Sequence, residues 1–177
     1  IWTMQSAWHN LPVFDPEGAA YTQHDGAQFA AREVAVLENG LAMDIAPAYG
    51  EVPGLGHYRR RAALSEAGLL LQDETDYPGT VALTLMSAER PEVRGGLTDG
   101  AAPAPMGGEK AGVPDGGSPG GILWFGTLAA AEISSSGKLT INTEAVPITD
   151  PRLRTAWPAT IYRTRVYFTG KLSVQVE

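Results

Sequence analysis

Short runs of alternating apolar and polar residues, each closed by a turn sequence, constrain this chain more than any other feature. The segment after Asn39-Gly40 alternates in this way, with apolar side chains on one face at Leu41, Met43 and Ile45. Asn-Gly supplies the positive φ angles that a tight hairpin turn requires, so residues 28–45 are predicted to form a β-hairpin. No segment shows a 3.6-residue apolar period over ten or more residues, so helices are expected to be few.

The same alternation recurs along the rest of the chain. A second hairpin is predicted around Glu66-Ala67-Gly68, and a further strand follows the turn at Pro78-Gly79. The strands expected after the first hairpin are 60–64, 69–73, 80–86, 122–125, 128–133, 138–146, 160–168 and 171–176. About ten short strands at this spacing predict an all-β fold, a two-sheet antiparallel β-sandwich.

Residues 95–121 separate two groups of these strands and differ from them in composition. Of these 27 residues, 14 are Gly or Pro, and almost none carries a large apolar side chain. Such a segment cannot offset the entropy of its own ordering by burial. We therefore predict a long flexible loop inside a single domain that spans 1–177. A linker between two domains is the alternative, but an insertion between two strands of one sandwich is the simpler account.

The charge balance and the absence of cysteine exclude several classes of function. The chain has 13 basic and 20 acidic residues, a net charge of -7, and a nucleic-acid partner would require a concentrated basic surface instead. Without cysteine, disulfides and thiolate metal sites are excluded. No apolar run approaches the roughly 20 residues that span a bilayer, so no membrane span is expected.

Local arginines would have to meet any acidic ligand. In a strand, Arg59-Arg60-Arg61 places two guanidinium groups on one face and one on the other, and arginine grips carboxylates with two parallel hydrogen bonds. A solvated strand edge is the other interpretation of such a charged run. Sugar-stacking platforms are a further possibility for the four tryptophans, but in short strands they belong more often to the core: Trp2, Trp8, Trp124 and Trp157.

The three histidines of the chain differ in the roles that their sequence surroundings suggest. His9 stands between Trp8 and a short apolar run, where an imidazole is a structural group, a metal ligand or an acid-base group. His24 and His57 lie in turn-like sequences, for which a solvated side chain is the simplest interpretation.

Six segments carry a resemblance to a known family. They are Ser6-Ala7-Trp8-His9-Asn10-Leu11-Pro12-Val13, residues 23–32, Asp44-Ile45-Ala46-Pro47-Ala48-Tyr49, Tyr58-Arg59-Arg60-Arg61, residues 150–157, and Ile161-Tyr162-Arg163. In this order they resemble the C-terminal β-sandwich of heparinase II/III-like polysaccharide lyases. The resemblance implies β-elimination on a uronic-acid-containing polysaccharide, and a parent protein that is periplasmic or secreted. The chain, which opens on Ile1-Trp2, is accordingly expected to be a C-terminal fragment whose N-terminal α-helical toroid domain is missing.

The resemblance also implies a zinc site in the full-length parent. His9 matches the histidine of the family's His-Asn motif, a zinc ligand, and neutral imidazole suits Zn²⁺. The family's other ligands, a histidine of a His-x-His element and an aspartate, match no residue of this chain. The zinc site is therefore expected to be incomplete here, with His9 as its one contributed ligand.

Catalytic residues are not assigned in this chain. The family's catalytic tyrosine and histidine lie chiefly on the toroid and match no residue here, so the chain alone is expected to be inactive, and its substrate-binding residues are unknown. Acidic polysaccharide is the expected partner, through the parent protein. The alternatives are a non-catalytic carbohydrate-binding module, with exposed aromatic residues on a sheet face or loop rim, and a structural module, with buried tryptophans and merely solvated arginines.

Overall fold

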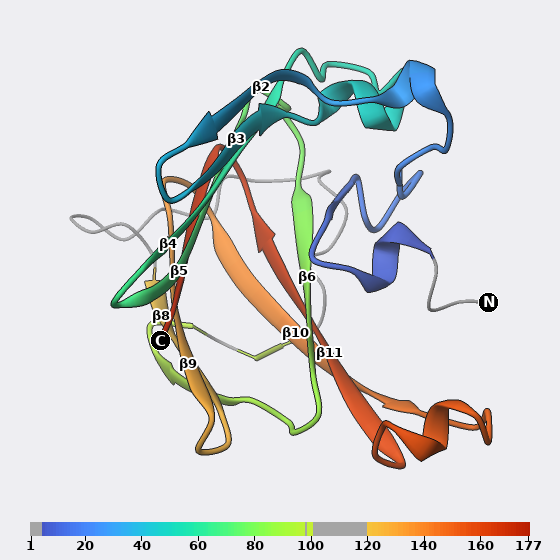
Figure 1. Ribbon diagram of the computed structural model, residues 1–177, viewed down its shortest axis with the longest axis vertical. Helices are drawn as coiled ribbons and strands as arrows, with labels where there is room; N and C mark the ends of the chain where they lie inside the picture. The colour runs from blue at the N-terminus through green and yellow to red at the C-terminus, as the bar shows by residue number, and fades with distance from the viewer. Residues whose placement is uncertain (1–4, 98, 101–119) are drawn as a thin grey trace.

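The computed structural model describes residues 5–97, 99–100 and 120–177, and these form two antiparallel sheets (Figure 1). The smaller sheet has the strand order β1 (Pro12–Phe14), β6 (Val81–Ser87), β11 (Thr160–Phe168) and β10 (Leu139–Pro147). The larger sheet has the order β2 (Arg32–Leu37), β3 (Gly40–Asp44), β4 (Tyr58–Ser65), β5 (Gly68–Thr75), β12 (Lys171–Val176), β9 (Ala129–Ser135), β8 (Gly120–Phe125) and β7 (Glu92–Gly95). The predicted all-β, two-sheet antiparallel sandwich is confirmed.

Helical structure is limited to single turns in the described residues. There are four 3₁₀ helices and no α-helix in this part of the chain: η2 (Ser6–Trp8), η3 (Ala27–Phe29), η4 (Ala46–Tyr49) and η5 (Leu153–Thr155). The two predicted hairpins are present as β2–β3 and β4–β5, and the strands predicted after residue 121 lie within two residues of their expected bounds.

The C-terminal strand β12 occupies the middle of the larger sheet. It pairs on one side with β5 and on the other with β9, so it joins the first half of the chain to the second. Without it, the remaining strands of this sheet would form two separate groups, β2 to β5 and β7 to β9.

The loop predicted over residues 95–121 is shorter than its composition suggests, because strands extend into it from both ends. Gly95 pairs with Gly121 at the ends of β7 and β8, so the strands extend into 95–121 from both sides. Asp99 forms an isolated parallel bridge with Ile141 of β10, and the Gly100 N–H donates to the Ile141 carbonyl at 3.2 Å. The rest of the predicted flexible loop lies outside the described residues.

The core lies between the inner faces of the two sheets. Phe14 of β1 is its aromatic centre, with edge-on rings of Tyr49, Tyr58 and Tyr77 at centroid distances of 4.8, 5.5 and 5.3 Å. Such edge-to-face contacts add stabilisation beyond the burial of apolar area. The buried aliphatic residues around this centre include Val81, Leu83, Leu123, Ile133, Ile141, Val166 and Val174.

A buried ion pair is part of the same interior. Arg60 of β4 donates two hydrogen bonds of 2.7 Å to the two carboxylate oxygens of Asp73 on β5, and Tyr58 donates a third to this carboxylate. Burial lowers the pKa of Arg60, but the hydrogen bonds and charge of Asp73 raise it by more, so the guanidinium stays charged. Its Nη1 donates to the Asn10 carbonyl at 2.6 Å, which fixes the segment before β1 to the larger sheet.

Candidate functional site

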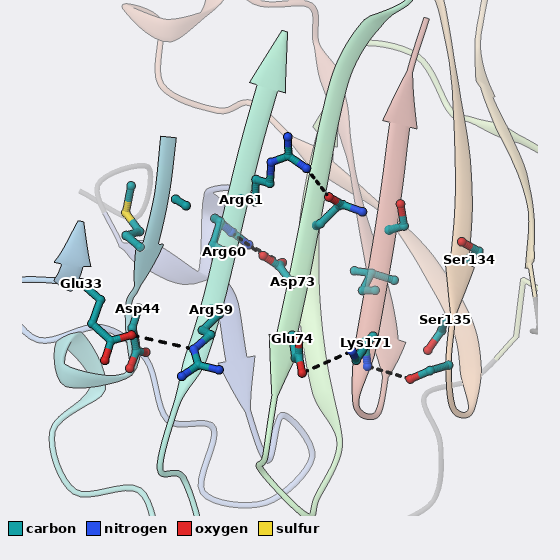
Figure 2. A pocket seen from close by; sticks show the side chains of 16 residues that line it. Glu33, Asp44, Arg59, Arg60, Arg61, Asp73, Glu74, Ser134, Ser135 and Lys171 are labelled. Carbon is teal, nitrogen blue, oxygen red and sulfur yellow. Dashed lines mark hydrogen bonds and ion pairs between the residues drawn. The ribbon is translucent and has the colours of Figure 1, made fainter. Parts of the chain in front are cut away.

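A polar groove of about 590 Å³ crosses β3, β4, β5, β12 and β9 on the outer face of the larger sheet (Figure 2). It is polar because the pleat of each strand sends alternate side chains away from the core. The strand register brings these side chains together across neighbouring strands, with Arg59 opposite Glu74 and Arg61 opposite Gln72. The outward residues that line the groove are Arg59, Arg61, Gln72, Glu74, Lys171, Ser173 and Ser134.

The run Arg59-Arg60-Arg61 divides between the two faces of β4 as the alternation predicts. Arg59 and Arg61 are exposed on the outer face, whereas Arg60 points inward to Asp73. This run is therefore neither a simple solvated edge nor a single three-arginine site. Two of its guanidinium groups belong to the groove, and the third belongs to the core.

The cations of the groove differ in how well they are neutralised. Lys171 Nζ lies 3.3 Å from Glu74 Oε1, and Arg59 Nε lies 3.9 Å from Glu33 Oε2. Within the described part of the chain, Arg61 has no carboxylate at ion-pair distance, and its only hydrogen bond is a long one of 3.4 Å to the amide oxygen of Gln72. Its guanidinium fork is therefore available to an external anion.

Two further carboxylates border the groove but do not neutralise Arg61. Asp73 forms an ion pair with Arg60, and Asp44 forms one with Arg32, whose Nε donates to it at 2.8 Å. Both carboxylates are almost fully buried. Among the described residues, the exposed part of the groove thus has three cations, Arg59, Arg61 and Lys171, against the two carboxylates Glu33 and Glu74.

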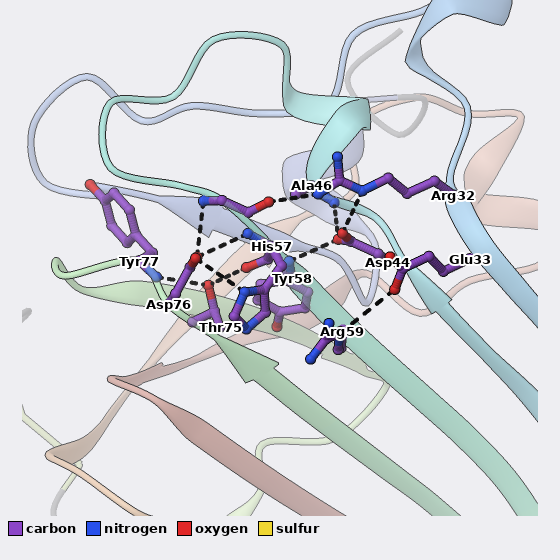
Figure 3. Close-up of polar contacts among 11 residues, drawn as sticks. Arg32, Glu33, Asp44, Ala46, His57, Tyr58, Arg59, Thr75, Asp76 and Tyr77 are labelled. Atoms are coloured by element: carbon purple, nitrogen blue, oxygen red, sulfur yellow. Dashed lines mark hydrogen bonds and ion pairs between the residues drawn. The ribbon is translucent and has the colours of Figure 1, made fainter.

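A network of hydrogen bonds surrounds Asp44, which borders the groove (Figure 3). One oxygen of its carboxylate accepts the backbone N–H groups of Ala46 and Tyr58, at 3.0 and 2.9 Å, and the other accepts from Arg32. Burial raises the pKa of Asp44, but these hydrogen bonds together lower it below its ordinary value. The carboxylate therefore fixes the loop that runs between β3 and β4.

A second carboxylate, Asp76, holds the other end of this loop (Figure 3). Its Oδ1 accepts the backbone N–H groups of Gly56 and His57, both at 2.9 Å, and its Oδ2 lies 3.1 Å from Nδ1 of His57. Burial raises the pKa of Asp76, and the two backbone hydrogen bonds lower it by more. His57 is thus a structural partner of Asp76, not a solvated turn residue.

The exposed Trp124 shares the outer face of the larger sheet with the groove. Gly120 of β8 pairs with the groove residue Ser134 of β9, and Trp124 of β8 pairs with Ala130. Trp124 therefore lies four residues along β8 from the position opposite Ser134, on the same face, which is a distance of about 13 Å. Trp124 is 37% exposed, and the Arg94 guanidinium lies 5.2 Å from its ring centroid.

The expectation that the tryptophans belong to the core is wrong for two of the four. Trp124 and Trp157 are both exposed. Trp124 lies on the outer face of β8, and Trp157 lies in the connection between η5 and β11. Trp8 is half-buried, with the Arg163 guanidinium 3.8 Å from its ring centroid, and Trp2 lies outside the described residues.

His9, the predicted zinc ligand, has an exposed position after η2, and its backbone N–H donates to the Ser6 carbonyl at 3.0 Å. Among the described residues, no group of three or more His, Cys, Asp or Glu side chains could hold a metal ion. These residues therefore do not fit a complete zinc site. A role for His9 as a zinc ligand stays a hypothesis for a longer protein, and metal analysis of that protein tests it. His24 stacks on Phe29 with a centroid distance of 4.8 Å.

The sequence did not indicate the groove residues of β12 and β9. Lys171 and Ser173 were predicted to alternate with apolar residues, but nothing local shows that they lie beside Glu74 and Gln72, about 100 residues earlier in the chain. Only the pairing of β12 with β5 and β9 assembles the groove.

No protein-family model matches the sequence, and no curated protein matches it either. The resemblance of its segments to heparinase II/III-like lyases therefore stays a prediction from the sequence. Among residues 5–97, 99–100 and 120–177 there is no helix with the length and apolar character needed to cross a membrane.

Proposed function

We propose that the chain binds an acidic, uronic-acid-containing polysaccharide in the groove on the outer face of the larger sheet. The observation that carries this proposal is the guanidinium of Arg61, which faces a groove of about 590 Å³ and has no carboxylate partner among the described residues. A uronate carboxylate can accept two parallel hydrogen bonds from such a group. Hydroxyl and amide groups of Gln72, Ser134 and Ser173 can bond to sugar hydroxyls beside it.

The polysaccharide is proposed to continue from the groove toward Trp124. This ring is exposed on the same sheet face, and an exposed indole can pack against the apolar face of a sugar. The exposed Trp124 and the incompletely neutralised Arg61 favour a binding module over a purely structural module, for which buried tryptophans and merely solvated arginines were expected.

The wider proposal is that this sandwich serves a polysaccharide lyase of the heparinase II/III type without performing the elimination itself. Elimination needs a group that neutralises the carboxylate, a base for the C5 proton and an acid for the leaving oxygen. Arg61 can fill the first role, but the described residues that line the groove include no histidine or tyrosine, and Lys171 and Glu74 are paired with each other. The groove thus supports binding rather than cleavage. A periplasmic or secreted location belongs to the same proposal.

The test is the affinity of the chain for heparan sulfate, chondroitin and alginate, measured by calorimetry, with neutral dextran alongside. We expect binding to the acidic polymers only, and an affinity about fivefold lower in Arg61→Gln, equivalent to about 1 kcal/mol for one charged hydrogen-bonding group. The matched control is Arg152→Gln, which removes the same charge at an 87% exposed side chain outside the groove.

Two results would count against this function. Equal affinity for dextran and for the acidic polymers would exclude recognition of the carboxylate, and equal losses in Arg61→Gln and Arg152→Gln would exclude the groove. The absorbance of an unsaturated uronate product, followed in the same mixtures, is expected to stay flat. A rise would show that the chain cleaves its ligand and would overturn the assignment of binding alone.

A further inference from the structure

A second, smaller cavity lies on the outer face of the smaller sheet. Its volume is about 100 Å³, and it is enclosed between residues 7–22 on one side and strands β6 and β11 on the other. Two guanidinium groups of β11, those of Arg163 and Arg165, line it together with Thr84 of β6. None of its described lining residues also lines the groove of the larger sheet.

The two arginines share a single carboxylate. Arg163 forms a close ion pair with Oε1 of Glu144 on β10, and its guanidinium also lies over the Trp8 ring. Arg165 reaches the same oxygen only at 3.6 Å. Its one other polar contact among the described residues is a long hydrogen bond of 3.5 Å to the Tyr167 hydroxyl. Among the described residues, Arg165 therefore has no carboxylate at ion-pair distance that it does not share with Arg163.

Burial makes this arrangement unbalanced. The Arg163 side chain is 10% exposed and that of Arg165 is 29% exposed, so both are largely withdrawn from water. Burial, and then the charge of Arg165, lower the pKa of Arg163. A further carboxylate, that of Glu17, accepts a hydrogen bond from the Tyr167 hydroxyl at 3.2 Å and does not line the cavity. Among the described residues, the cavity thus has two cations that share one carboxylate, in surroundings where an uncompensated charge is costly.

We infer that this cavity binds one small oxyanion, a carboxylate or a sulfate group, through Arg165 and Arg163. A volume of about 100 Å³ is well below the roughly 300 Å³ at which pockets begin to enclose a whole organic ligand. The site therefore admits a charged group rather than a sugar ring. Because 29% of the Arg165 side chain is exposed, the anion reaches the guanidinium from solvent. This site is independent of the polysaccharide proposal.

The experiment follows the arginine Nε–H resonances of the chain by NMR during titration with sodium sulfate, sodium glucuronate or glucose at constant ionic strength. We expect saturable shifts at Arg165 with sulfate or glucuronate and none with glucose. Arg165→Gln, followed at the Arg163 Nε–H resonance, should weaken binding by about tenfold or more, since it removes a charged donor. Glu144→Gln should tighten it several-fold, because the anion then no longer competes with a carboxylate.

Arg61→Gln, in the groove on the other sheet, is the matched control and should leave these shifts unchanged. Saturation by glucuronate identifies a sugar acid as an acceptable source of the anion, and saturation by sulfate alone identifies an inorganic one. The inference is overturned if neither anion moves the Arg165 resonance, or if binding persists in Arg165→Gln. It is also overturned if Glu144→Gln, shown to be folded by its unfolding curve, binds no more tightly. A failure of polysaccharide binding in the groove leaves these outcomes unaffected.

Discussion

Asp44 accepts three hydrogen bonds although its side chain is almost fully buried, and it does so at the end of a strand that otherwise carries no ionised group. Two of the donors are backbone N–H groups on either side of the loop between β3 and β4, and the third is Arg32. A single carboxylate therefore satisfies two backbone N–H groups, at the two ends of this loop, together with one guanidinium N–H.

Replacing Asp44 by asparagine is expected to lower the free energy of unfolding by about 2 to 3 kcal/mol near neutral pH. The amide keeps one acceptor for the backbone donors, but its NH₂ group meets the Nε–H of Arg32, donor against donor. Urea denaturation measures the loss. Asp25→Asn, at an exposed position in the preceding loop, is the control and should cost almost nothing.

The effect of Asp44 is expected to depend on pH with a definite sign. Its pKa is lower in the folded than in the unfolded chain, so its stabilisation is complete above the unfolded value of about 4. It is lost as the pH falls through the lower folded-state value. The difference between the parent and Asp44→Asn should therefore shrink below about pH 4. A constant difference down to strong acid would contradict this role.

The β4–β5 hairpin depends on one glycine more than on any other residue of its turn. Gly68 has a φ of +106°, and a Cβ at this position would lie 2.0 Å from the carbonyl oxygen of Val176 on β12. Both the conformation and the neighbouring backbone therefore demand glycine. The turn Glu66-Ala67-Gly68 thus holds β12 close to β5 as well as reversing the chain.

Gly68→Ala is accordingly expected to destabilise the chain by more than about 2 kcal/mol, since the clash is with backbone and the φ angle is strained. The matched control is Gly100→Ala, because a Cβ there meets none of the described residues within 4 Å. It should change stability by less than about 0.5 kcal/mol. Thermal or urea unfolding of both variants decides the matter, and equal stabilities would show that β12 can move away from the turn.

The sequence predicted the elements that depend on residues close together in the chain. It did not predict those that depend on contacts between distant parts of the chain. The Asn39-Gly40 hairpin and the alternation within 171–176 follow from residues that are neighbours in the chain. The short strand β7 has no such pattern, and the outer position of Trp124 depends on which face of β8 the core takes. Propensity alone assigned that ring to the core, and tertiary packing overrode it.

The candidate site divides in the same way. The alternation of Arg59-Arg60-Arg61 predicted that two of these guanidinium groups share one face of the strand, but not which face points outward. Their polar neighbours were not predicted, because Lys171 and Ser173 arrive through strand pairing across about 100 residues. The pairing of Arg60 with Asp73 could not be predicted either, since nothing in the sequence of β5 marks Asp73 as a buried carboxylate.

The Arg60–Asp73 pair connects the layers of the whole molecule. It lies on the inner face of the larger sheet and, through Asn10, holds the segment that leads into β1 of the smaller sheet. A buried pair is weak evidence for stability, because desolvation offsets the attraction, yet breaking it is costly.

We therefore expect Asp73→Asn to destabilise the chain by about 3 to 5 kcal/mol, because it leaves a buried guanidinium without its anion. The double variant Arg60→Met with Asp73→Leu should lose less than the single one, since no charge is left uncompensated. Urea denaturation compares them, with Arg59→Gln as the control for an exposed arginine whose partner lies 3.9 Å away. A double variant less stable than Asp73→Asn would show that the pair is favourable in itself.

The central place of β12 also fixes an order of events during synthesis. Until residues 171–176 have left the ribosome, β2 to β5 and β7 to β9 have no strand to join them, and both groups expose an unpaired edge. The larger sheet thus becomes continuous only after nearly all of the chain described here has been translated. A nascent chain that is stalled before this strand keeps these edges exposed, as do the partly folded states that chaperones bind, and the groove across β3, β4, β5, β12 and β9 is not assembled in it.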